Sequence, residues 1–156
     1  MADQPSPEDL ARWHRWFAIE SNNMAWPLAD QRSRTDAEQD EMLNAAHAAA
    51  WHWSRVGNAL NDARARMLLA HAHATCGNGR MALRYARPSH AYLMSYNCPD
   101  WEIAFSHAVM AHAAAAAGDP DLHSSHYAAA QAAGEAIVGA ADKEIFETSF
   151  AVIPAP

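Results

Sequence analysis

The side chains in this sequence that could do chemistry are mostly histidines, of which the chain has ten in 156 residues. Imidazole can bind transition metals, move protons near neutral pH or hydrogen-bond inside a core. His47 and His52 are five residues apart, as are His107 and His112. That spacing sets the members of each pair about 140° apart around a helix. One regular helix therefore cannot point both members of either pair at a single metal ion.

The other short spacings are no better as metal sites. His71 and His73 are two apart and point to nearly opposite sides of a helix, whereas His123 and His126 are three apart but have no carboxylate or Cys beside them. The sequence contains no H-E-x-x-H, G-x-S-x-G, Walker A or G-x-G-x-x-G pattern. It therefore specifies no catalytic residue, no cofactor and no metal.

The elements that must position these histidines are predicted to be helices. The chain has 38 Ala but only four Val, five Ile and three Thr. Ala is the strongest helix former, and strands are usually rich in β-branched residues. The composition predicts one all-α domain spanning residues 1–156.

Capping and breaking residues divide this domain into helices. Thr35 and Glu38 form a capping-box pattern, Asn58 or Asn61 can cap the next helix, and Gly57 is a candidate C′ residue. Short loops force consecutive helices to lie antiparallel. We expect three hairpins, at about 8–56, 58–96 and 99–138, followed by a capping helix at 142–151 and a loose C-terminal tail.

Two cysteines, Cys76 and Cys98, fall at opposite ends of the predicted fourth helix. That helix would separate them by roughly 25 Å, whereas a disulfide needs Cα atoms within about 7 Å. Both thiols are predicted to be free.

The charge distribution excludes two classes of partner. The net charge is −7, all ten Arg lie at or before Arg87, and residues 88–156 hold the whole excess of acids. Nucleic acids and anionic membranes are bound by clustered Lys and Arg. We therefore expect neither partner. The acidic N-terminal stretch does not resemble a signal peptide, which predicts a cytoplasmic protein.

A weak internal repeat connects distant parts of the chain. Gly77 and Gly118 each end an Ala-rich helix and stand 41 residues apart, and the same offset maps His71 onto His112. Helical-hairpin repeats of about 34–47 residues are typical of α-solenoids.

The stretch AHAHATCGNGRMALRYA resembles the tetratricopeptide repeat, in which a small-residue helix and a Gly turn precede an A-L-x-Y-A helix. The matching positions are Ala70, His73, Gly77, Ala82 and Ala86. The second copy, MAHAAAAAGDPDLHSSHYAAA, matches less well because His123 replaces a small residue. The segment AAHAAAWHWSRVGNALNDARA is also similar to a group of bacterial tetratricopeptide-like proteins. The resemblance covers residues 60–138 and implies a short solenoid of stacked hairpins. A closed helical bundle is the alternative.

The resemblance also implies a concave groove. The family's groove positions correspond to Arg64, Met67 and His71 in one unit, and to Phe105, Ala108 and His112 in the next. His71 and His112 would then lie side by side on adjacent helices. With Arg64 they would suit a carboxylate, a phosphate or, given a third ligand, a metal ion.

Aromatic residues could wall this groove or fill the core. Five of the six Trp fall in the first 53 residues, and the simplest expectation is packing between the first two helices. Otherwise aromatic walls would come from two groups: His47 with Trp51, and His14 with Trp13 and Trp16.

Three functions remain open. The first is an interaction module that binds a peptide, a partner helix or a second copy of the chain in the groove. The second is a metal- or small-molecule-binding enzyme or sensor with a His-rich, Trp-walled interior, which needs three of His47, His52, His71, His107 and His112 within about 5 Å of one point. The third is a pH-responsive module, since ten imidazoles titrate near pH 6.5.

Overall fold

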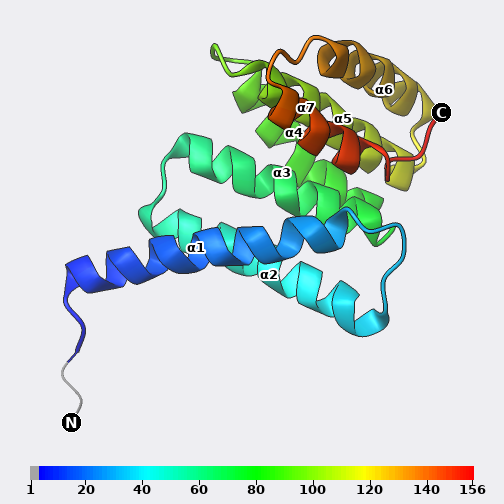
Figure 1. Cartoon of the computed structure of the whole chain (residues 1–156). Helices are drawn as coiled ribbons and strands as arrows, with labels where there is room; N and C mark the ends of the chain where they lie inside the picture. The colour runs from blue at the N-terminus through cyan, green and yellow to red at the C-terminus, as the bar shows by residue number, and fades with distance from the viewer. Residues whose placement is uncertain (1–3) are drawn as a thin grey trace.

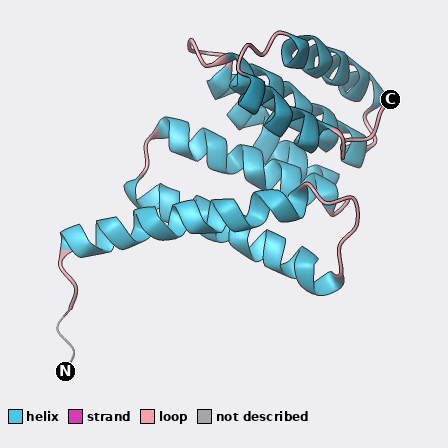
Figure 2. Cartoon of the chain, in the orientation of Figure 1, coloured by secondary structure: helices cyan, strands magenta, loops and turns pink. Residues whose placement is uncertain are grey.

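The computed structural model describes residues 4–156 and contains only helices and loops in that range (Figure 2). The all-α prediction is confirmed. The seven helices are α1 (Pro7–Ala29), α2 (Asp36–Val56), α3 (Ala59–Thr75), α4 (Gly79–Leu93), α5 (Asp100–Ala117), α6 (Pro120–Glu135) and α7 (Ala140–Phe150).

The helices form three antiparallel hairpins, α1–α2, α3–α4 and α5–α6, stacked in chain order (Figure 1). Helix α3 contacts both α1 and α5, so these three helices form one continuous layer. Helix α7 packs on α5 and α6 and closes the C-terminal end of the stack. The arrangement is the predicted repeat-like stack with a capping helix.

Local sequence explains where most helices begin. In the capping box of α2, the Glu38 carboxylate accepts a hydrogen bond from the Thr35 amide at 2.8 Å, and the Glu38 amide donates to the Thr35 hydroxyl at 3.2 Å. Asn58 and Asn61 make the same reciprocal pair at the start of α3. These contacts satisfy amides that have no partner inside the helix.

The 41-residue repeat is visible in the backbone. Gly77 and Gly118 end α3 and α5 with nearly identical positive φ angles of 71° and 72°, a conformation that L side chains rarely adopt. Gly79 follows at the start of α4, where an added Cβ would lie 2.2 Å from the Ala117 amide nitrogen. Gly57 behaves differently, because it caps α2 in an extended conformation (φ −85°) rather than as a left-handed C′ residue.

Small residues let the helices approach closely. Ten of the 21 buried residues of α3 and α5 are Ala, and they stand between larger side chains such as Leu68, Phe105 and Met110. Close helix packing is what a stack of hairpins requires to bury a continuous core.

The expectation about the C-terminal tail is wrong, and the one about the tryptophans is wrong for three of them. The tail is bound rather than loose, because Ile153 is buried and the Pro154 carbonyl accepts a hydrogen bond from His123 Nε2 at 2.8 Å. Trp13, Trp16 and Trp51 are exposed and do not fill the core between α1 and α2, whereas Trp26 is half-buried and packs against that core. The small residues on the facing sides of α1 and α2, with Met42, fill that space instead.

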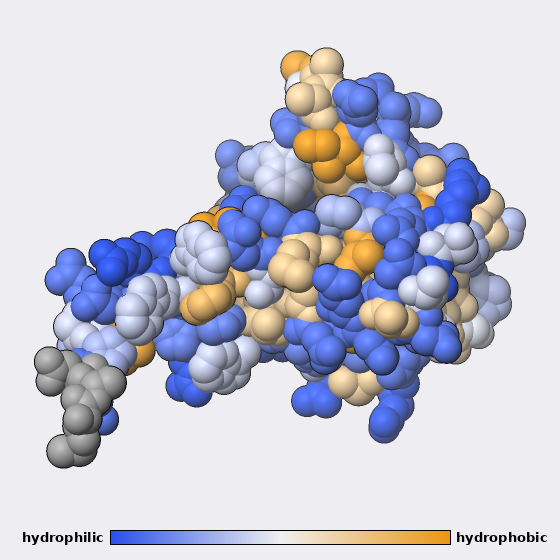
Figure 3. All heavy atoms as spheres, turned by 60° about the horizontal axis from the view of Figure 1, so that its bottom comes forward, coloured by the Kyte–Doolittle hydropathy of each residue, from blue (hydrophilic) through white to orange (hydrophobic). Residues whose placement is uncertain are grey.

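The surface carries its apolar residues in small groups. On the face that lies at the bottom of Figure 1, hydrophobic residues form separate groups among hydrophilic ones (Figure 3). Among residues 4–156, no helix combines the length and apolar character needed to cross a bilayer.

Candidate functional site

A hollow of about 420 Å³ lies between α1, α3, α5 and α7. Three of the predicted groove residues, Arg64, Met67 and Phe105, line it. The remaining lining residues come from three elements: Asn22, Asn23, Trp26 and Asp30 from α1 and its C-cap, Trp101 from α5, and Ile145 and Ser149 from α7. The volume lies within the range of ligand-binding pockets.

Arg64 is held by contacts that neutralise its charge. Its Nε donates to Glu102 Oε1 at 2.5 Å, and its guanidinium lies 5.4 Å from the centre of the Trp101 ring. Glu102 is completely buried, and its other oxygen accepts a hydrogen bond from the Tyr96 hydroxyl at 2.9 Å. Burial and this hydrogen bond raise the pKa of Tyr96 to about 12. Since the buried carboxylate balances the cation, the hollow is less suited to an anion than Arg64 alone suggests.

The structure confirms that His71 and His112 are neighbours. Their Nδ1 atoms are 3.0 Å apart and their ring centres 4.9 Å apart. The prediction that both rings line the groove is wrong, because His71 is fully buried and His112 is 6% exposed. The Trp26 ring covers His71, with 5.3 Å between ring centres, and so separates it from the hollow.

A chain of hydrogen bonds holds this buried pair. His71 Nε2 lies 3.2 Å from Asp30 Oδ1, and the Ser149 hydroxyl donates to Asp30 Oδ2 at 2.8 Å. A carboxylate only accepts, so the proton of His71 faces Asp30 and its Nδ1 can accept from His112 Nδ1–H. Burial lowers the pKa of His112 to about 2, with a smaller contribution from His71. The chain links α1, α3, α5 and α7 and has the character of a structural network.

The other three predicted binding residues lie outside the groove. His47 Nε2 is 3.2 Å from His73 Nε2, and burial lowers the pKa of both rings. His52 Nδ1 is 2.8 Å from His14 Nδ1. Trp51 is half exposed. These residues project from α2 toward α1, α3 and solvent, so they cannot wall the hollow between α3 and α5.

Four of the five histidines that were considered for a metal site lie in separate pairs, and the fifth, His107, does not lie near them. Within residues 4–156, the only group of three or more side chains with metal-ligating atoms close together is a different one: His90, His107 and His126. One ring nitrogen from each lies within 4.8 Å of the nitrogens of the other two.

Sequence reasoning missed this triad because it compared residues only within a helix or at the 41-residue offset. His90, His107 and His126 lie on α4, α5 and α6, and the members of each consecutive pair differ by four residues, about one helical turn, in their distance from the intervening turn. Residues placed this way meet across an antiparallel hairpin. Pairing residues across each predicted turn could have found the triad.

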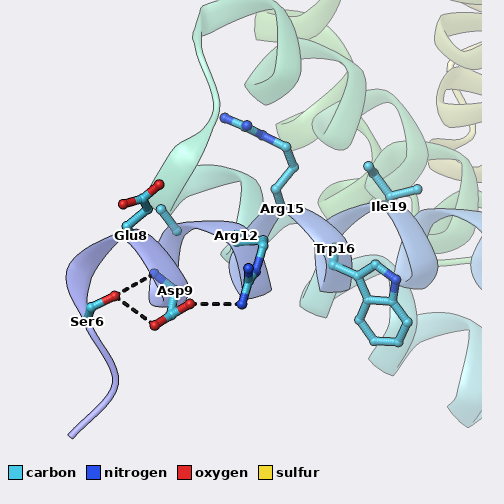
Figure 4. A pocket seen from close by; sticks show the side chains of 8 residues that line it. Ser6, Glu8, Asp9, Arg12, Arg15, Trp16 and Ile19 are labelled. Carbon is cyan, nitrogen blue, oxygen red and sulfur yellow. Dashed lines mark hydrogen bonds and ion pairs between the residues drawn. The ribbon is translucent and has the colours of Figure 1, made fainter.

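A larger hollow, of about 710 Å³, is a weaker candidate for a binding site. All eight of its lining residues belong to α1 or its N-cap, as Figure 4 shows. The Asp9 carboxylate accepts hydrogen bonds from Ser6 and Arg12 at 2.8 Å, so these three polar side chains bond to one another. With no opposing wall, this surface is a solvated helix face.

The two cysteines are free, as predicted. Burial raises the pKa of the Cys76 thiol and of the Cys98 thiol. Both therefore remain protonated at neutral pH and are poor nucleophiles.

In comparisons with known proteins, no protein-family model, no curated protein and no solved structure matches the chain.

Proposed function

We propose that this protein is a tetratricopeptide-like interaction module that binds a segment of another protein along the face formed by α1, α3 and α5. The observation that carries the proposal is the position of Arg64, Met67 and Phe105. These residues were expected in a groove from sequence resemblance alone, and they line one hollow between four helices.

The shape of the surface favours an elongated ligand. A smaller hollow of about 190 Å³ adjoins the first and shares Asn22 and Arg64 with it. Ile19 and Trp53 extend this second hollow toward the N-terminal half of α1. Two connected hollows along α1 and α3 suit a peptide segment better than a compact small molecule.

The chemistry of the wall indicates which segment would bind. Trp26, Trp101 and Ile145 offer apolar and aromatic surface, which suits one or two large apolar side chains. The Asp30 carboxylate faces the same hollow, and Asp142 lies beside Ile145 and Trp101 in a further small hollow. With the charge of Arg64 balanced by Glu102, we expect Lys or Arg next to the apolar residues of the ligand.

The alternative, a metal- or small-molecule-dependent enzyme or sensor built on the expected histidines, has less support. His47 and His52 lie in pairs outside the hollow, and His71 and His112 are buried beneath it. None of the four presents a free ring to the pocket.

A peptide-display selection against the whole chain tests the proposal. Selected peptides should carry a large apolar residue beside a basic one. Their affinity should fall as salt concentration rises. Ile145→Arg places a long cation across the hollow at a position that is already 60% exposed. We expect it to weaken binding at least about tenfold, by charge repulsion and steric block.

The matched control is Val138→Arg, because Val138 is an exposed aliphatic residue that lines neither hollow. This variant should bind as the native chain does. The proposal fails if no peptide is selected, or if Ile145→Arg binds the selected peptides as tightly as Val138→Arg. If the chain forms a dimer without peptide and Ile145→Arg abolishes that dimer, the ligand of this surface is a second copy of the chain and not a peptide.

A further inference from the structure

A second site, separate from the groove, is formed by His90, His107 and His126. The three rings form a nearly equilateral triangle with centre-to-centre distances of 4.8, 5.0 and 5.1 Å. His107 is two residues from Phe105, which places it about 200° around α5 from that groove residue. The triad and the groove therefore lie on opposite sides of α5.

The imidazole nitrogens are close enough to share one ion. His107 Nδ1 and His126 Nδ1 are 2.9 Å apart, and the three candidate nitrogens lie within 4.8 Å of one another. Four-coordinate zinc has Zn–N bonds of about 2.0–2.1 Å, which corresponds to nitrogens about 3.3 Å apart. The observed range includes this value, so small rotations of the rings would bring all three nitrogens to one metal.

One ring already has the support that metal ligands usually have. His90 Nδ1 lies 2.7 Å from the hydroxyl of Ser106, which is itself buried. If His90 donates Nδ1–H to this hydroxyl, its Nε2 carries the lone pair and is free to coordinate. Hydrogen bonds of this kind orient metal-binding histidines and fix their tautomer.

The surroundings of the rings favour the neutral form that a metal requires. Burial lowers the pKa of all three rings, and the two neighbouring imidazoles help to lower that of His90 to about 4. Neutral imidazole is the form that binds metals. Unlike the pair at His71, the triad includes no carboxylate that would hold a proton on one of its rings.

We propose that His90, His107 and His126 bind one divalent first-row transition-metal ion of the zinc class. Imidazole ligands alone favour zinc, copper or nickel over calcium or magnesium, which prefer oxygen ligands. All three rings are only partly buried, so a fourth position remains open to water or to a ligand. Three protein ligands with one open position is the arrangement of catalytic rather than structural zinc sites.

The direct test is a titration of the untagged full chain with zinc chloride in isothermal calorimetry, at pH 7.5 and in the presence of a weak competing chelator. We expect one zinc ion per chain. His107→Gln and His126→Gln should each weaken binding by more than about 100-fold, beyond the effect of losing an outer-shell partner. Ser106→Ala should weaken it about tenfold.

The matched control is His47→Gln, which removes one histidine from a two-histidine contact on α2 and α3 and should leave zinc affinity unchanged. Circular dichroism verifies that each variant is folded. If a ligand variant fails to fold, cobalt in the native chain should give the visible absorption of a four-coordinate site. The proposal is wrong if the native chain binds no zinc, or if His47→Gln weakens binding as much as His126→Gln does.

Discussion

Two clusters of histidine in this molecule show how the same side chain can take opposite roles. The pair His71–His112 is buried, and its outer nitrogen meets the Asp30 carboxylate, which also accepts from Ser149. The triad His90–His107–His126 is partly exposed and has only a hydroxyl beside it. In the first cluster a carboxylate faces the ring proton, whereas in the second no carboxylate belongs to the group and His107 and His126 share a ring–ring hydrogen bond.

The difference teaches that the neighbours of a histidine, and not the number of histidines, decide whether a site can form. In the buried pair, both ring nitrogens of His71 and Nδ1 of His112 make hydrogen bonds. These bonds favour one fixed arrangement of the four helices. In the triad, one ring nitrogen from each of three helices lies close to the other two, so a single cation could be shared by the three rings.

The comparison predicts its largest effect in acid. The pKa of His112 is lowered to about 2 in the folded state. In the unfolded chain the same imidazole is protonated below about pH 6.5, so between these two pH values only the unfolded state binds the proton. This contribution to stability is complete above pH 6.5 and is lost as the pH falls toward the folded pKa. Each pH unit costs about 1.4 kcal/mol, or about 3 kcal/mol between pH 6.5 and 4.5. Urea unfolding at a series of pH values measures this slope.

A matched pair of variants sharpens the same comparison. His112→Gln removes the titrating group but keeps an amide that can donate to His71. It should lower the slope of the unfolding free energy against pH by the amount that corresponds to about one bound proton. His126→Gln should flatten it less, because His126 is only partly buried and solvent screens its charge. If the stability of the two variants depends equally on pH, burial does not distinguish the two clusters.

A smaller effect is expected from removing the carboxylate of the buried pair. Asp30→Ala leaves the His71 ring N–H and the Ser149 hydroxyl without their acceptor. We expect a loss of about 2 kcal/mol in the free energy of unfolding at pH 7.

The control for this variant is Asp62→Ala, which removes an exposed ion pair with Arg66 within α3. It should cost no more than about 0.5 kcal/mol. Both values come from urea denaturation followed by circular dichroism. Comparable losses in the two variants would mean that the Asp30 network does not tie the helices together.

Much of the fold could be predicted because its signals are local. Thr35 and Glu38 identify the start of α2, and the glycines at 77 and 118 fix two turns through their backbone conformation. The 41-residue offset even placed His71 beside His112. Local capping and a regular repeat do not depend on how distant elements pack.

The candidate sites were predicted less well because they depend on tertiary packing. Trp26 lies over His71 and contributes to its burial, and the contact with Glu102 balances the charge of Arg64. Neither contact has a sequence spacing that identifies it. The exposed Trp13 and Trp16 show the same limit, because large apolar residues were assigned to a core that alanines fill.

The central claim is that the triad binds a metal while the buried pair serves the fold, and histidine ring NMR with zinc tests it most directly. One equivalent of zinc at pH 7.5 should shift the ring signals of His90, His107 and His126, assigned from single-residue variants. The signals of His71 and His112 should stay in place. Zinc-induced shifts at His71 and His112, or none at the triad, would contradict the account.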